Sequence, residues 1–228
     1  MKIRELFEDN TANDEYSKKW LAKWEESCLG NYEKYKREMS NYYIRGGGEI
    51  VFQGNVYILS SNFLQNDELP IQISECRRLL VATPEITSFK NFPKYIFGWS
   101  TSDEDFVLQL RKANSLDFFN KLTSLEGITP IVEGNVDLSK VPNLSYHNAH
   151  NYLHSIDGVL NISGKYEGPL LSVLMIKKLT SVISKNAWPL GKLEMACEII
   201  SKHLQSDGDI LECQEELIDA GLQQYARL

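Results

Sequence analysis

Two stretches of the sequence share one eight-residue pattern: Asn120–Gly127 reads NKLTSLEG and Asn151–Gly158 reads NYLHSIDG. The common form is N-x-L-x-S-[LI]-[ED]-G. Weaker copies of its centre occur at Ile86–Phe89 and at Leu179–Val182. A pattern that returns along a chain predicts similar units that stack on one another, because one short unit cannot bury its own apolar face.

A second pattern, G-x-[VL]-x-[IL], occurs at Gly54–Ile58, Gly134–Leu138 and Gly158–Ile162. Its alternating apolar residues are typical of a short strand that turns one side to the core. Asn can bond backbone groups where the chain turns, and Gly permits the positive φ of a tight corner. Residues 49–185 are therefore expected to stack as a β-solenoid, with strand-like segments at Glu49–Leu59, Ile71–Val81, Phe106–Leu110, Gly134–Leu138 and Gly158–Ile162.

Helical patterns flank this segment on both sides. Residues 14–43 carry apolar side chains at three- and four-residue steps and predict two short helices, or one helix broken at Gly30: Tyr16, Trp20, Leu21, Trp24 and Cys28, then Tyr32, Tyr35, Met39 and Tyr42. Gly46–Gly48 is interpreted as a linker. A third helical stripe comprises Leu193, Ala196, Cys197, Ile200 and Leu204.

The C-terminal sequence predicts one more helix. Asp209, followed by Glu212 three residues later, forms a capping-box-like start, and Gly221 is expected to end the helix. We therefore expect one compact unit in three parts: an N-terminal helical segment (1–48), an irregular repeat β-solenoid (49–189) and a C-terminal helical cap (190–228).

The repeats resemble the leucine-rich-repeat-like proteins of tailed bacteriophages, whose copies often read N-x-L-T-S-L-E-G-x-P. Asn120–Gly127, with Pro130 after it, carries the resemblance best, and the resemblance covers about residues 80–185. The ending Ile210–Leu222 is also similar to a tail found on such phage proteins. The implied fold is α+β: an irregular leucine-rich-repeat-like β-solenoid flanked by N-terminal and C-terminal helices.

The spacing of the copies departs from that family. Its copies return at short, even intervals, whereas matched positions here lie 36 residues apart (Ile86 to Leu122), 31 apart (Asn120 to Asn151) and 26 apart (Leu153 to Leu179). The solenoid is therefore expected to be irregular. The resemblance predicts a scaffold and does not name a partner, because repeat folds serve many recognition functions.

Composition excludes several classes of protein. The chain has 228 residues and a formal net charge of −7, which argues against a protein that coats nucleic acid. No apolar run approaches the roughly 20 residues of a membrane span, and residues 1–10 lack the apolar stretch of a signal peptide. The cysteines form no C-x-x-C pair, so we expect buried thiols in a reducing cytoplasm: Cys28, Cys76, Cys197 and Cys213.

Two clusters could carry chemistry. His147, His150 and His154 would share one face of a helix and could bind a metal, but the stretch runs directly into a repeat copy, so we interpret them as surface or turn residues. Asp103, Glu104 and Asp105 could hold Mg²⁺ or act as acid and base, but no Lys or His stands at a recognisable place beside them. We therefore expect a solvated loop there, and we predict no catalytic residue, no cofactor and no metal.

Charge is distributed unevenly along the chain. Residues 14–45 hold seven Lys or Arg and six Asp or Glu, whereas residues 193–228 hold two and eight, a net charge of −6. The acidic residues of this last segment come with no cation nearby in the sequence: Asp207, Asp209, Glu212, Glu215, Glu216 and Asp219. One interpretation is a solvated helix face, with acidic residues near the helix start because they are favoured there. The other is a surface that attracts a basic partner electrostatically.

Aromatic residues in the N-terminal helices offer a second candidate surface. Trp20 and Trp24 either pack on the first repeat or form an exposed anchor patch, since Trp is enriched at interface hot spots. The candidate partner-binding residues are thus Asp209, Glu212, Glu215, Glu216, Asp219, Trp20 and Trp24.

These features favour a binding protein over an enzyme. We expect a phage-encoded module that docks on a host or bacterial-defence protein in the host cytoplasm and inhibits it, without direct contact to nucleic acid or membrane, as a monomer or small oligomer. A toxin that modifies nucleic acid, such as a DNA ADP-ribosyltransferase, is a candidate partner because its cleft would be basic. The alternatives are a virion or assembly component and an enzyme without a recognisable motif.

Overall fold

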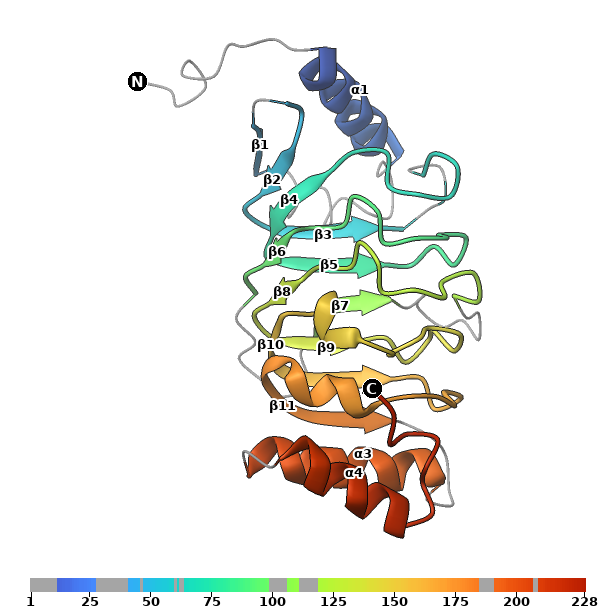
Figure 1. Ribbon diagram of the computed structural model, residues 1–228. Helices are drawn as coiled ribbons and strands as arrows, with labels where there is room; N and C mark the ends of the chain where they lie inside the picture. The colour runs from blue at the N-terminus through green and yellow to red at the C-terminus, as the bar shows by residue number, and fades with distance from the viewer. Residues whose placement is uncertain are drawn as a thin grey trace.

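The computed structural model describes residues 12–27, 41–45, 47–59, 61, 64–98, 106–110, 119–184, 191–206 and 209–228. Within these residues the protein is α+β, with helices at both ends of a curled, mixed β-sheet (Figure 1). The helices are α1 (Ala12–Ser27), α3 (Lys192–Gln205) and α4 (Ile210–Asp219), and two 3₁₀ segments, η3 (Ala149–Asn151) and η4 (Leu171–Met175), lie between strands.

The sheet consists of two rows of short strands that run along the molecule. Its order is β1-β2-β4-β6-β8-β10-β9-β7-β5-β3, with β11 also paired to β10. The strands are β1 (Tyr42–Ile44), β2 (Ile50–Phe52), β3 (Asn55–Ile58), β4 (Ile73–Cys76), β5 (Arg78–Val81), β6 (Tyr95–Ile96), β7 (Phe106–Leu110), β8 (Ile131–Val132), β9 (Asn135–Asp137), β10 (Ser155–Ile162) and β11 (Lys177–Ser184).

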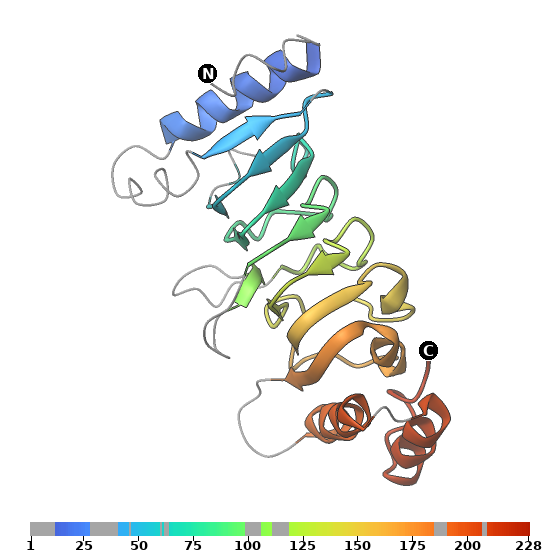
Figure 2. The same ribbon diagram turned by 90° about the vertical axis from the view of Figure 1, so that its left-hand side faces the viewer.

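The chain alternates between the two rows. Strands β2, β4, β6 and β8 pair in parallel in one row, and β3, β5, β7 and β9 pair in parallel in the other. The eight-residue strand β10 joins the rows, because its first residues pair with β8 and its later ones with β9. Figure 2 shows the first row as a stack of arrows between the N-terminal and C-terminal helices.

Alternation of apolar residues explains how the second row forms the core. Successive strands place one apolar side chain opposite the next, and every member of the column is at most 2% exposed: Val56, Leu79, Leu108, Val136, Leu160 and Val182. Side chains at every second position of a strand point to the same side, so the period of two seen in the sequence builds this column directly.

The G-x-[VL]-x-[IL] pattern lies in register between β9 and β10. Val136 pairs with Leu160, so Gly134 and Gly158 occupy matching places in adjacent layers. A Cβ on Gly158 would lie 2.3 Å from Oδ1 of Asn135, and that oxygen accepts a hydrogen bond from the Val159 N–H at 2.8 Å. Glycine is therefore required at position 158 by the close approach of the neighbouring layer.

Strand pairing corrects part of the repeat alignment. Tyr95 pairs with Ile131, 36 residues later, which is the spacing found between Ile86 and Leu122. Ile131 pairs with Ser155, only 24 residues later, so the 31-residue match of Asn120 to Asn151 is wrong as a structural equivalence. The side chain of Asn143 occupies the role expected of Asn151, because its amide donates to the Asn120 carbonyl at 2.9 Å.

The segment before β2 is a hairpin rather than a helix and linker. Tyr42 and Tyr43, expected at the end of a helical stretch, lie in β1 and pair antiparallel with β2. Gly47 and Gly48 have φ values of 93° and 84° and form the hairpin turn, in which the Gly48 N–H donates to the Arg45 carbonyl at 3.1 Å. The expected helical residues 28–40 lie outside the described part of the chain.

Both ends of the sheet are covered by helices. Ser17 of α1 donates to the Gly48 carbonyl at 2.6 Å, and Ser201 of α3 bonds both the N–H and the carbonyl of Val182 in β11. The C-terminal residues fold back on η4, where the Leu170 N–H donates to the Tyr225 carbonyl at 3.1 Å. Buried apolar residues from Trp20 to Ala226 form one continuous cluster.

The helices agree with several sequence predictions. The stripe on α3 buries Leu193, Ala196, Cys197 and Ile200 as expected, and Asp209 is the N-cap of α4, where its Oδ1 accepts the Leu211 N–H at 2.8 Å. Cys76, Cys197 and Cys213 are free and buried, whereas Cys28 lies outside the described residues. Among the residues described, no helix has both the length and the apolar character to cross a membrane.

Candidate partner-binding surface

Helix α4 carries the acidic residues that the sequence singles out. It buries Cys213 and Leu217 against the rest of the cap and turns Glu212, Glu215 and Asp219 to solvent. No described residue forms an ion pair or hydrogen bond with these three carboxylates. Asp209 is also exposed, but one of its oxygens caps the helix.

Glu216 differs from its neighbours and corrects the expectation that these acids have no local cation. Lys202 Nζ of α3 donates to both carboxylate oxygens of Glu216 at 2.8 Å, and His203 Nε2 lies 2.8 Å from Oε2. The hydrogen bonds from Lys202 and His203 hold the pKa of Glu216 below its usual value. This carboxylate therefore ties α4 to α3 and is not free for a partner.

Two exposed apolar side chains lie among the free carboxylates. Leu211 is 64% exposed and Ile218 is 44% exposed. The sequence pattern places both in one apolar set with Leu217, Leu222 and Tyr225, and the structure corrects this, because only the last three are buried. Seven residues make almost two turns of helix, so positions 211 and 218 share one side of α4, opposite Cys213 and Leu217. That spacing was the signal that could have separated them from the core.

Trp20 does not form an exposed patch with these residues. Trp20 is only 8% exposed and belongs to the buried cluster under α1. Trp20 is therefore a core residue rather than part of an exposed anchor patch. The side chain of Trp24 lies outside the described part of the protein.

The three histidines lie in η3 or within three residues of it and differ in exposure. His147 and His154 are exposed and His150, in η3, is half-buried. Across the residues described, no group of three or more His, Cys, Asp or Glu side chains could hold a metal ion. The acidic residues Asp103, Glu104 and Asp105 lie outside those residues.

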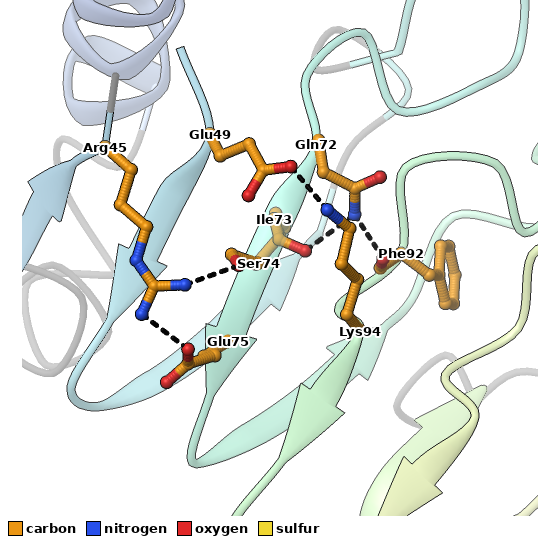
Figure 3. A network of polar contacts seen from close by, with 8 residues as sticks. All are labelled: Arg45, Glu49, Gln72, Ile73, Ser74, Glu75, Phe92 and Lys94. Carbon is orange, nitrogen blue, oxygen red and sulfur yellow. Dashed lines mark hydrogen bonds and ion pairs between the residues drawn. The ribbon is translucent and has the colours of Figure 1, made fainter. Parts of the chain in front are cut away.

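A polar network on the first row of strands joins the β1–β2 hairpin to the next layers (Figure 3). Arg45 donates to Ser74 Oγ at 3.1 Å and to Glu75 Oε1 at 2.6 Å, and Lys94 forms an ion pair with Glu49. Gln72 donates to the carbonyls of Ile73 and Phe92, both at 2.7 Å. Each ion pair thus spans one intervening strand: Arg45, after β1, reaches Glu75 in β4 across β2, and Lys94, before β6, reaches Glu49, before β2, across β4.

A pocket of about 600 Å³ adjoins the network, between the loops that lead to β4, β6 and β8. Its volume lies in the range of ligand sites. One of its carboxylates is already paired within the pocket: Glu68 accepts hydrogen bonds from Ser88 at 2.8 Å and from Lys90 at 3.1 Å. These contacts, first the hydrogen bond from Ser88 and then that from Lys90, lower the pKa of Glu68.

No protein-family model, curated protein or solved structure matches this chain.

Proposed function

We propose that this chain is a non-catalytic, phage-encoded module that binds and inhibits a host or bacterial-defence protein. In this proposal the two rows of strands form an irregular leucine-rich-repeat-like solenoid, and the C-terminal cap presents the binding surface. A toxin that modifies nucleic acid, such as a DNA ADP-ribosyltransferase, is a suitable partner because its substrate cleft must attract phosphate.

The regular alternation between rows supports the solenoid interpretation. Paired residues in neighbouring layers lie 20 to 36 positions apart in the chain, which matches one repeat per layer. A stack of layers buries a continuous core and leaves its ends to be covered. Helices α1 and α3 cover those ends, and the rest of the scaffold is then free to vary for recognition.

The free carboxylates of α4 carry the functional part of the proposal. Glu212, Glu215 and Asp219 are exposed and have no cationic partner among the described residues, whereas Glu216 beside them is paired. Exposed charges of one sign steer an oppositely charged partner and raise the rate of association. An acidic surface would also repel nucleic acid, so a basic protein is the favoured partner.

Co-purification from bacterial cells, with and without phage infection, tests the proposal. We would compare the tagged full chain with the double variant Glu212→Lys/Glu215→Lys. The matched control is Glu126→Lys/Glu167→Lys, which changes the net charge equally at exposed positions outside the cap. Wild type and control should each co-purify with a host or defence protein in a stoichiometric amount. The amount that co-purifies with the α4 variant should be at least tenfold lower.

Other outcomes contradict the proposal in different ways. Retention of the partner by a folded α4 variant would exclude this surface. Recovery of capsid or tail proteins alone would favour a virion or assembly component. If wild type retains no partner in either condition, the inhibitor proposal is wrong and an enzyme becomes the better hypothesis. Unchanged thermal unfolding of each variant would establish that the substitutions act on binding.

A further inference from the structure

The outward side of α4 combines apolar and acidic residues in one narrow strip. Leu211 and Ile218 lie on the same side of the helix, about 10 Å apart along its axis, from the rise of about 1.5 Å per residue. Glu215 stands between them, and Glu212 and Asp219 flank them. We call these five residues the α4 strip.

Helix stability does not account for the strip. Acidic residues near the N-terminus of a helix interact favourably with its dipole, which explains Asp209 and Glu212. Glu215 and Asp219 lie towards the C-terminus, where negative charge is unfavourable, and the last turn has no basic residue. Like charges three and four residues apart, at positions 212, 215 and 219, also repel one another. The arrangement therefore fits binding better than folding.

We propose that the α4 strip docks a basic amphipathic helix of the partner protein. Two apolar side chains of that helix would pack on Leu211 and Ile218, and its Lys or Arg residues would face Glu212, Glu215 and Asp219. This inference rests on the proposed function and names the chemistry of the segment that the partner presents. Charge complementarity selects a basic segment over an acidic one.

The spacing of the apolar pair favours a helix as the occupant. Residues i and i+7 of a second helix are also about 10 Å apart on one side, so two helices packed at a small crossing angle bring both pairs into contact. An interface along ten residues of one helix is smaller than the standard patch of about 800 Å² per partner. An isolated helix is therefore expected to bind with a dissociation constant in the micromolar range. Most of the salt dependence of this binding should come from the carboxylates.

A synthetic peptide provides the direct test. The probe is a 15-residue peptide of Leu and Lys with Leu at helical positions i, i+3, i+4, i+7 and i+11. Its control has the same composition in a scrambled order, which keeps the charge and loses the apolar stripe. Binding of each peptide to the full chain would be measured by fluorescence anisotropy in low salt and at about 0.15 M salt.

The amphipathic peptide should bind at least tenfold more tightly than the scrambled one. The variant Leu211→Gln/Ile218→Gln should bind the amphipathic peptide at least fivefold more weakly than wild type does. Gln removes the apolar anchors but is itself a good helix former. Met195→Gln is the matched control, since Met195 of α3 is also exposed, at 41%, but lies outside the strip. The Met195→Gln variant should bind the amphipathic peptide as tightly as wild type does.

Equal binding of the two peptides, or no binding of the amphipathic peptide, would overturn the inference. Unchanged binding by Leu211→Gln/Ile218→Gln would overturn it as well. These failures are separate from failure of the proposed function. If cells retain the partner with Leu211→Gln/Ile218→Gln but lose it with Glu212→Lys/Glu215→Lys, the acidic surface binds a partner by another mode.

Discussion

The strand face in Figure 3 and the outward side of α4 carry charge in opposite ways. On the strand face, Arg45 pairs with Glu75 and Lys94 with Glu49, so each ion pair connects two strands across the one that lies between them. On α4, Glu212 and Glu215 have no cationic partner among the described residues. Charges that join layers belong to the fold, whereas unpaired charges at the end of the stack are available to another molecule.

The largest effect should come from a polar group that joins two layers in the interior. Ser172 of η4 is fully buried, donates to the Tyr146 carbonyl at 2.7 Å and accepts the Ala149 N–H at 2.9 Å. Ser172→Ala should lower the free energy of unfolding by about 2 kcal/mol, because it removes both bonds from buried backbone groups. Urea unfolding measures this change.

The exposed Ser145→Ala is the control for this variant, since Ser145 Oγ only accepts the His147 N–H at 3.3 Å at the surface. A loss for Ser172→Ala no larger than that for Ser145→Ala would contradict the role given to the buried hydroxyl. Partner binding by Ser172→Ala, measured below its unfolding temperature, should equal that of wild type, because the α4 strip is unchanged.

An intermediate effect should separate two neighbouring carboxylates on α4. Glu216→Gln should cost about 1 kcal/mol, because it weakens the contacts with Lys202 and His203 that hold α4 to α3. Glu215→Gln should change stability by less than about 0.5 kcal/mol, or raise it slightly by removing repulsion from Glu212 and Asp219. Urea midpoints of both variants, measured at pH 7, give the comparison.

The two variants should show the opposite order in binding. Glu215→Gln removes a charge of the α4 strip, so it should weaken binding of the basic amphipathic peptide more than Glu216→Gln does. Equal losses of stability in the two variants would mean that the Lys202–Glu216 contact does not stabilise the C-terminal cap. The distinction between paired and free carboxylates on α4 would then be wrong.

The sequence predicts the parts of this molecule that depend on local periodicity. Alternation around Val136 and Leu160 identified strands that are in the structure, and the stripe from Leu193 to Ile200 identified α3. Asp209 was recognised as an N-cap because its side chain acts on backbone only two residues away. Each of these predictions needs information from a few neighbouring residues only.

Features that depend on distant segments were missed or assigned wrongly. Tyr42 fits a helical step as well as a strand, and only the turn at Gly47–Gly48 and pairing with β2 make it a strand. Pairing of Glu216 with Lys202 needs two helices brought together by a turn. The 31-residue repeat match was wrong as a structural equivalence because the layers differ in length. The shared motif at Asn120 and Asn151 therefore occupies different positions in the two layers.

The smallest effect, and the one that tests charge pairing most directly, concerns Glu49 and Lys94. The Lys94 ammonium lowers the pKa of Glu49 from its usual value of 4.5. A carboxyl with a lowered pKa in the folded state stabilises the fold above its unfolded pKa, and this contribution is lost as the pH falls through the folded pKa. Both side chains are partly exposed, so the contribution should be about 0.5 kcal/mol.

Glu49→Gln should therefore be less stable than wild type at pH 7, and the difference should shrink as the pH falls below about 4. Lys94→Met is the matched variant: in its background, Glu49→Gln should have a much weaker pH-dependent effect, because the ammonium that lowers the pKa is gone. Urea unfolding of the four proteins between pH 3 and pH 7 completes the double-mutant cycle. A stability difference that stays constant over this range would show that Glu49 and Lys94 are neighbours without being an effective ion pair, and the strand face would then resemble α4 in its electrostatics.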